Sequence, residues 1–144
     1  MLKRAAAGAG IAAAAALIAW TAGLFYYQRK VAAAIEHLRE EHLRATEPGS
    51  FRDQARTSVM GITALGCRAL PALVAELDPD VSPYYLCRVA DCLTDLSDGE
   101  APRVVFEDDP GQRRKSVDAL RAWWEGGGRR RHDWWRFWTS KCVR

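Results

Sequence analysis

The residues with the most distinctive chemistry lie near the C-terminus, where arginine and tryptophan dominate from Arg129 to Trp138. Such side chains suit a lipid headgroup layer, stack on the bases of single-stranded nucleic acid, or cap a helical core through cation–π contacts. Core capping is the simplest interpretation, a membrane interface is the second, and nucleic acid is disfavoured. The candidate surface for a partner or a membrane consists of Arg129, Arg130, Arg131, Trp134, Trp135, Arg136 and Trp138.

Patterns for catalysis or metal binding fail on their spacing. His37 and His42 stand five positions apart, about 140° around a helix, whereas a zinc-protease helix needs two histidines four positions apart. The glycines at 126–128 lack the Lys-Ser/Thr pair of a phosphate loop, and the acidic residues at 98–109 do not fit an EF-hand. The sequence therefore predicts no catalytic, cofactor-binding or metal-binding residue, and a binding protein rather than an enzyme.

The cysteines are even in number, as in an exported protein with two disulfides. They are Cys67, Cys87, Cys92 and Cys142, and three connectivities are possible. Cys87 and Cys92 are five positions apart, so they would face about 140° away from each other on a helix and should not pair. Unpaired thiols that fill helix interfaces are an equally good interpretation.

The element that positions the rest is an uncharged segment from Ala5 to Tyr27, flanked by basic pairs at 3–4 and 29–30. At ~1.5 Å per residue, this segment can cross a hydrocarbon core of ~30 Å. Aromatic residues followed by cations are typical of the end of a spanning helix. Residues 1–27 are therefore predicted to be a transmembrane anchor. A signal peptide cleaved after Gly23 is the alternative, and a buried core helix is disfavoured because it would have no polar face.

The orientation in the membrane is set by the short N-terminal tail. The basic residues near the two ends of the apolar segment are nearly balanced, so charge alone does not decide. A tail of about four residues before a single span more often stays inside, which would place the domain on the non-cytoplasmic side of the inner (plasma) membrane. The expected partners are the membrane, through residues 5–27, and an unidentified protein.

The remaining chain is predicted to consist of helices separated by turns, without a convincing pair of strands. Residues 28–45 form a juxtamembrane stalk with an apolar seam, and four helices are expected at 51–65, 68–77, 83–96 and 112–125. The seam consists of Val31, Ile35, Leu38 and His42, and the predicted domain core of Leu73, Val89, Leu93, Leu120 and Trp124. Ser50 with Asp53, and Ser82, are expected at helix N-termini. The fold class is therefore all-α.

The charges are unevenly distributed along the chain. Residues 1–45 carry a net charge of +3, residues 46–111 carry −7 and residues 112–144 carry +7. A basic, Trp-rich tail at 126–144 therefore follows an acidic body. The simplest consequence is that the tail packs on the body, with residues 129–131 facing its acidic surface; the alternative is that it meets an external anionic surface.

The segment from Ala64 to Val74 resembles the inter-helix turn and second helix of a HEAT-type repeat. The turn at 78–80 and the helix at 88–93 look like the start of the next unit, and Gln112–Glu125 is similar to a helix that closes short bacterial HEAT-like proteins. The resemblance covers residues 51–125, about one and a half to two units. HEAT-like families share no catalytic residues, so the resemblance implies an interaction module.

The expected protein is thus a membrane anchor and stalk followed by a small HEAT-like helical domain that serves as an interaction or scaffold module. One alternative is a secreted or periplasmic disulfide-linked helical protein after signal cleavage. Another is a lipid- or nucleic-acid-binding regulator that uses the basic tail.

Overall fold

The computed structural model describes residues 2–44 and 54–129, with side chains at 13–41 and 59–129. Every regular element in these ranges is helical, which confirms the all-α class. The elements are α1 (Leu2–Arg44), α2 (Gln54–Thr63), the 3-10 turn η1 (Gly66–Ala69), α3 (Leu70–Ala75), α4 (Pro83–Leu96), α5 (Pro110–Trp123) and the π-helical turn η2 (Trp124–Gly128).

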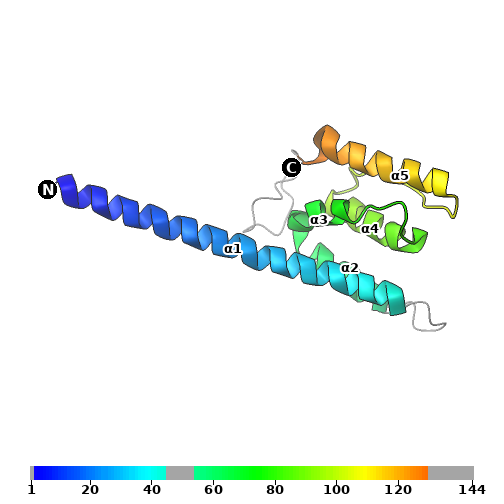
Figure 1. Ribbon diagram of the computed structural model, residues 1–144, viewed down its shortest axis with the longest axis horizontal. Coiled ribbons are helices and arrows are strands. Elements are labelled where there is room, and N and C mark those ends of the chain that lie inside the picture. Colours follow the sequence, from blue (N-terminus) through cyan, green and yellow to red (C-terminus); the bar gives the residue numbers. More distant parts are fainter. Residues whose placement is uncertain (1, 45–53, 130–144) are drawn as a thin grey trace.

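The dominant element is α1, a single helix of 43 residues that joins the predicted anchor and stalk without interruption. At ~1.5 Å per residue it is about 65 Å long. Its N-terminal half projects beyond the other helices, whereas its C-terminal half lies along them (Figure 1). Within the described ranges, no helix combines the length and the apolar character that a membrane crossing requires.

The C-terminal half of α1 is part of the domain core. Val31, Ile35 and Leu38 are buried, and this part of the helix packs against α2, η1 and α3. The sequence predicted a stalk outside the domain, whereas its apolar seam forms one wall of the core. Three apolar residues repeating at intervals of four and three face one direction, and the domain covers that face. The side chain of His42, the last predicted member of the seam, lies outside the described ones.

The core lies between three layers of helices, with α1 and α2 on one side, α3 and α4 in the middle and α5 on the other side (Figure 1). All five predicted core residues are buried, namely Leu73, Val89, Leu93, Leu120 and Trp124. Two arginines of α5 tie the outer layer to the turn after α3. Arg113 Nη1 donates to the Val81 carbonyl at 3.1 Å, and Arg121 donates to the Leu77 carbonyl.

Helix α4 has the predicted boundaries. Pro83 stands in its first turn, where a missing N–H costs no intrahelical hydrogen bond. Ser82 occupies the N-cap position, but its side chain makes no capping hydrogen bond, contrary to the prediction. The helix ends with Asp98 (φ 56°) and Gly99 (φ 82°) in left-handed conformations, and the Gly99 N–H donates to the Thr94 carbonyl at 2.8 Å.

The other boundaries differ from the predicted ones by a few residues. The region expected as one helix at 68–77 is divided into η1 and α3, with Pro71 in the first turn of α3. Helix α5 begins earlier than expected, because the Asp109 side chain accepts the Gln112 N–H at 2.7 Å. It continues into η2, and Gly127 (φ 150°) interrupts the helical backbone there. The predicted caps Ser50 and Asp53 lie outside the described residues.

Candidate functional site

The part of α1 that leaves the domain carries aromatic and basic side chains in register. The Arg29 guanidinium carbon lies 4.9 Å from the centre of the Phe25 ring, and Lys30 Nζ lies 4.8 Å from the centre of the Tyr26 ring. Each pair is four residues apart, the spacing that stacks side chains on one helix face. The Tyr26 and Tyr27 rings meet edge to face at 5.5 Å. We refer to Phe25, Tyr26, Tyr27, Arg29 and Lys30 as the collar.

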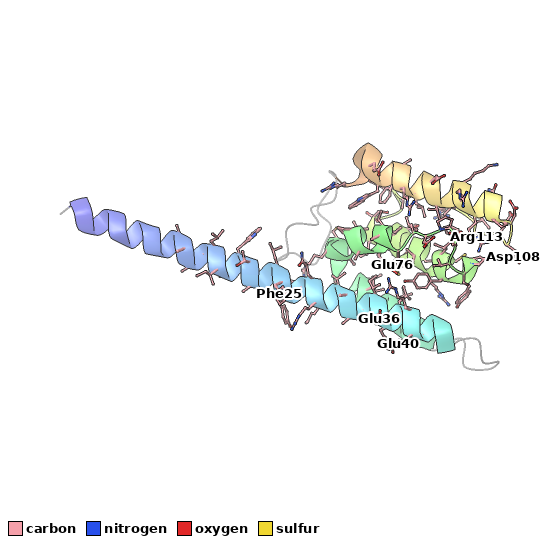
Figure 2. All side chains as sticks on the ribbon, in the orientation of Figure 1. Phe25, Glu36, Glu40, Glu76, Asp108 and Arg113 are labelled. Atoms are coloured by element: carbon pink, nitrogen blue, oxygen red, sulfur yellow. The ribbon has the colours of Figure 1, made fainter. Side chains whose placement is uncertain are left out.

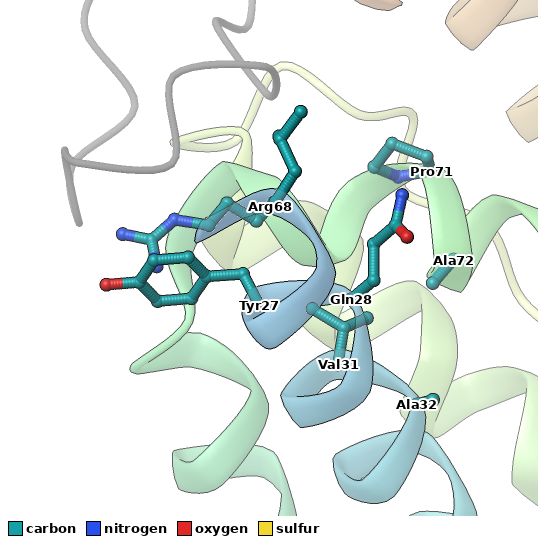
Figure 3. A pocket seen from close by; sticks show the side chains of 8 residues that line it. Tyr27, Gln28, Val31, Ala32, Arg68, Pro71 and Ala72 are labelled. Atoms are coloured by element: carbon teal, nitrogen blue, oxygen red, sulfur yellow. The ribbon is translucent and has the colours of Figure 1, made fainter. Parts of the chain in front are cut away.

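Arg68 connects the collar to the domain. Its guanidinium carbon lies 3.8 Å from the centre of the Tyr27 ring, so η1 and α1 are joined by a cation–π contact (Figure 3). Beside this contact is a groove of about 380 Å³ between α1 and the η1–α3 segment. Its lining is mostly apolar and consists of Leu24, Tyr27, Gln28, Val31, Ala32, Arg68, Pro71 and Ala72.

Large apolar side chains are exposed on the projecting part of α1. Leu17 and Ile18 are 65% and 68% exposed, and within the collar Phe25 and Tyr26 are 58% and 54% exposed. Figure 2 shows Phe25 on the projecting side of the helix. Large exposed apolar patches are typical of surfaces that contact a membrane or another protein. The collar lies where this exposed segment ends and the domain begins.

A polar cluster holds α1 on the domain at the other end of their contact. Arg39 donates two hydrogen bonds to Glu76, from Nε at 2.8 Å and from Nη2 at 2.7 Å, and the Tyr85 hydroxyl donates to the same carboxylate at 2.7 Å. Glu76 ends α3 and faces α1 (Figure 2). Burial, followed by the Glu76 carboxylate, raises the pKa of Tyr85, which therefore stays a neutral donor. We refer to Arg39, Glu76 and Tyr85 as the clamp.

The cysteines fall into two classes. Cys67 in η1 is buried and disulfide-bonded. Cys87 and Cys92 on α4 are free, so a framework of two disulfides is excluded. They do not pair with each other, as their helical spacing predicted. Cys92 is fully buried, and this burial raises the pKa of its thiol to about 12, which keeps the thiol neutral and inert.

The predicted surface residues fall almost entirely outside the described part of the chain. Arg129 is described; it is exposed and follows η2 directly. Arg130, Arg131, Trp134, Trp135, Arg136 and Trp138 lie outside the described residues, so this candidate surface stays a prediction. Sequence reasoning did not find Arg68 or the clamp, because their partners are 41, 37 and 9 positions away and no local pattern connects them.

The described side chains contain no group of three His, Cys, Asp or Glu residues that could hold a metal ion. His37 Nε2 lies 3.1 Å from Glu41 Oε1, one turn further along α1, and the histidine is largely exposed. This pairing is typical of a solvated helix face.

Comparisons with protein-family models, with curated proteins and with solved structures find no match to this chain. The HEAT-like organisation therefore stays a prediction from the sequence.

Proposed function

We propose that this chain is a single-pass membrane protein in which the N-terminal half of α1 anchors a small helical interaction domain. The observation that carries the proposal is the change of environment along one continuous helix. Leu17 and Ile18 are exposed, whereas Val31, Ile35 and Leu38 on the same helix are buried in the domain. The domain thus covers one end of α1 and leaves the apolar end for another environment.

A lipid bilayer suits the exposed end better than water does. Transfer of a leucine or isoleucine side chain out of water is favourable by about 1.5–3 kcal/mol. No charge occurs between Ala5 and Tyr27, although the side chains before Ala13 lie outside the described ones. The collar follows this segment, and aromatic rings with neighbouring cations are typical of headgroup depth. The collar would therefore mark the membrane surface, with the domain directly above it.

The disulfide supports a position of the domain on the non-cytoplasmic side of the plasma membrane. Cys67 is disulfide-bonded, and such bonds persist in oxidising compartments, whereas cytosolic thiols are kept reduced. This agrees with the orientation expected for a short N-terminal tail before a single span.

The domain itself suits a protein partner. On the face formed by α4 and the loop after it, a groove of about 520 Å³ combines Arg88, Asp91, Asp95 and Arg103 with the apolar side chains of Val59 and Val104. Val105, in the same loop, is 68% exposed. Mixed charges around apolar side chains are common at protein interfaces. We assign this face to a protein partner, in a domain of HEAT-like type without catalytic activity.

Membrane fractionation of the full chain tests the anchor. The wild-type chain is expected in the membrane pellet after alkaline extraction, with Met1 to Gly23 retained when its N-terminus is read by mass spectrometry. Ile18→Lys should release much of the chain, because a cation inside the hydrocarbon core costs about 2.5–3.5 kcal/mol. Met60→Lys is the matched control, since Met60 is 66% exposed on α2 within the domain. Soluble exported chains that begin at Leu24 would contradict the anchor and support signal cleavage.

A further inference from the structure

The groove beside the collar continues the exposed apolar segment of α1 into the domain. Leu24, at its N-terminal end, belongs to the uncharged segment, whereas Ala32 lies in the part of α1 that packs on the domain. Along α1 the groove therefore extends over about 12 Å. The buried Val31 belongs to its lining, and Pro71 and Ala72 line it from α3 (Figure 3). The groove thus offers an apolar molecule a continuous path from the exposed segment to the domain.

A single cation stands among these apolar side chains. Arg68 lies beside Tyr27, with its guanidinium carbon 3.8 Å from the centre of the ring, and Pro71 and Ala72 lie on the other side of the groove (Figure 3). None of the described lining residues carries a carboxylate. A guanidinium that stacks on an aromatic ring through its face can bind phosphate through its N–H edge. The lining therefore suits a molecule with a long apolar part and one anionic group.

We infer that the groove holds one acyl chain of an anionic phospholipid, whose phosphate contacts Arg68 at the level of the collar. The bound chain lies along Val31, Ala32 and Ala72, and the second chain stays in the bilayer. This inference rests on the proposed function, because a phospholipid reaches the groove only if α1 is in a membrane.

Position and charge favour a phospholipid over a protein segment. Aromatic rings with neighbouring cations are typical of headgroup depth, so in a membrane the collar and Arg68 would be surrounded by lipid phosphates. Arg29 and Lys30 add two positive charges at the same level of α1. Clustered cations next to a membrane-inserted apolar segment attract anionic lipid. The volume of about 380 Å³ is at the lower end of the range of ligand pockets, ~300–1,000 Å³, and suits a thin chain better than a helix of ~10–12 Å diameter.

Photolabelling in nanodiscs tests the groove. The full chain is inserted into discs that contain a trace of phosphatidylglycerol with a diazirine in one acyl chain, or of phosphatidylcholine with the same chain. Labelled peptides are identified by mass spectrometry. We expect label on the peptide that contains Pro71 and Ala72, because these residues belong to the domain and not to the apolar segment of α1. The label should be about fivefold stronger with phosphatidylglycerol, the factor that one basic residue near an anionic surface provides.

Two adjacent alanines of α1 provide matched variants. Ala32 and Ala33 are both exposed, but Ala32 lines the groove and Ala33 is not among its described lining residues. Ala32→Trp fills the groove and should remove most of the label from the peptide with Pro71 and Ala72, whereas Ala33→Trp should keep it. Neither exposed substitution should change the urea midpoint of the domain appreciably. Arg68→Gln removes the cation and should abolish the preference for phosphatidylglycerol.

The outcomes separate this inference from the proposed function. A chain that fails to enter the discs contradicts the anchor and this inference together. An inserted chain that is labelled on α1 before Leu24, but not on the peptide with Pro71 and Ala72, contradicts the inference alone; a protein segment in the groove would give this result. Equal labelling by the two lipids, or equal labelling of Ala32→Trp and Ala33→Trp, would also overturn it.

Discussion

At the scale of single residues, Cys92 should limit the stability of the domain at alkaline pH. Burial raises the pKa of this thiol to about 12 in the folded chain, whereas an exposed cysteine ionises near ~8.5. The unfolded chain therefore loses this proton first. The stabilisation is fully present below pH ~8.5, and it is lost as the pH rises toward 12, by up to ~1.4 kcal/mol per pH unit. Urea unfolding of the full chain in detergent at pH 7 and pH 10 measures this loss.

Variants of the two free cysteines separate this effect from general alkaline damage. Cys92→Ala should flatten the pH dependence between pH 8.5 and 10, even though its small cavity lowers stability at pH 7 as well. Cys87→Ala, on the same helix but only partly buried, should keep the wild-type slope. The raised pKa of Tyr85 adds a loss of the same sign at higher pH. Equal slopes for Cys92→Ala and the wild type would refute the assignment to Cys92.

The sequence predicted individual core residues better than it predicted contacts. Leu73, Val89, Leu93 and Leu120 are fully buried because helical periodicity determines which residues face inward. The contact of Arg68 with Tyr27 and that of Arg39 with Glu76 join residues on different elements. Periodicity contains no information on which faces meet, so neither could be predicted. The collar, by contrast, is a local pattern of aromatic residues followed by cations, and it can be recognised in the sequence.

At the scale of elements, the end of the last described helix should depend on Gly128. A Cβ atom there would lie 3.0 Å from Trp123 Cε2 and 3.2 Å from the Trp123 carbonyl oxygen, closer than side chains normally pack. Gly128→Ala is therefore expected to lower the free energy of unfolding by about 1–3 kcal/mol. Gly126→Ala is the control, because a Cβ at Gly126 meets nothing within 4 Å, and it should be neutral or slightly stabilising. Denaturant unfolding measures the free energy of unfolding of both variants, which should have equal m-values. Equal stability of Gly128→Ala and Gly126→Ala would contradict the close approach at Gly128.

The clamp should determine how firmly α1 is held on the domain. Glu76→Gln keeps the shape of the side chain but removes the charge that Arg39 contacts through two hydrogen bonds. Because Arg39 is about half exposed, the expected loss is modest, about 1–2 kcal/mol. Glu36→Gln should change stability by less than about 0.5 kcal/mol, because Glu36 is exposed and its ion pair with Arg39 is long, with 3.4 Å between Glu36 Oε2 and Arg39 Nη1. Hydrogen exchange over residues 31–41 provides the readout, and a similar effect of both variants would argue against the clamp.

Element boundaries were predictable where capping signals are strong. Pro83 fixed the start of α4, and its end followed from the turn residues at 97–99. The start of α5 was placed too late, because Asp109 was grouped with the acidic loop although its carboxylate caps the helix. The segment 68–77 was predicted as one helix, whereas η1 and α3 divide the region from Gly66 to Ala75. Because a 3-10 turn and an α-helix place apolar side chains on similar faces over so few residues, the pattern could not distinguish them.

At the scale of the whole molecule, no local pattern in the sequence indicates that one part of α1 is buried in the domain while another part is exposed. A seam of Val31, Ile35 and Leu38 fits a free stalk, a coiled coil or a wall of a core equally well. The three-dimensional arrangement decides among them, because α2, η1 and α3 cover this face. The domain therefore requires part of the helix that also carries the exposed apolar segment, so the domain and this segment share one continuous helix.

Two isoleucines on α1 test this dual role, because they differ in environment and not in type. Ile35 is 6% exposed and Ile18 is 68% exposed. Ile35→Ala is expected to lower the free energy of unfolding of the domain by about 2–5 kcal/mol, through lost transfer energy and a cavity. Ile18→Ala should leave domain stability unchanged within about 0.5 kcal/mol, since surface substitutions away from the core rarely do more. Urea unfolding in detergent, followed by Trp fluorescence, measures both variants. A loss of less than about 1 kcal/mol for Ile35→Ala would mean that α1 is an attached stalk and not a wall of the core.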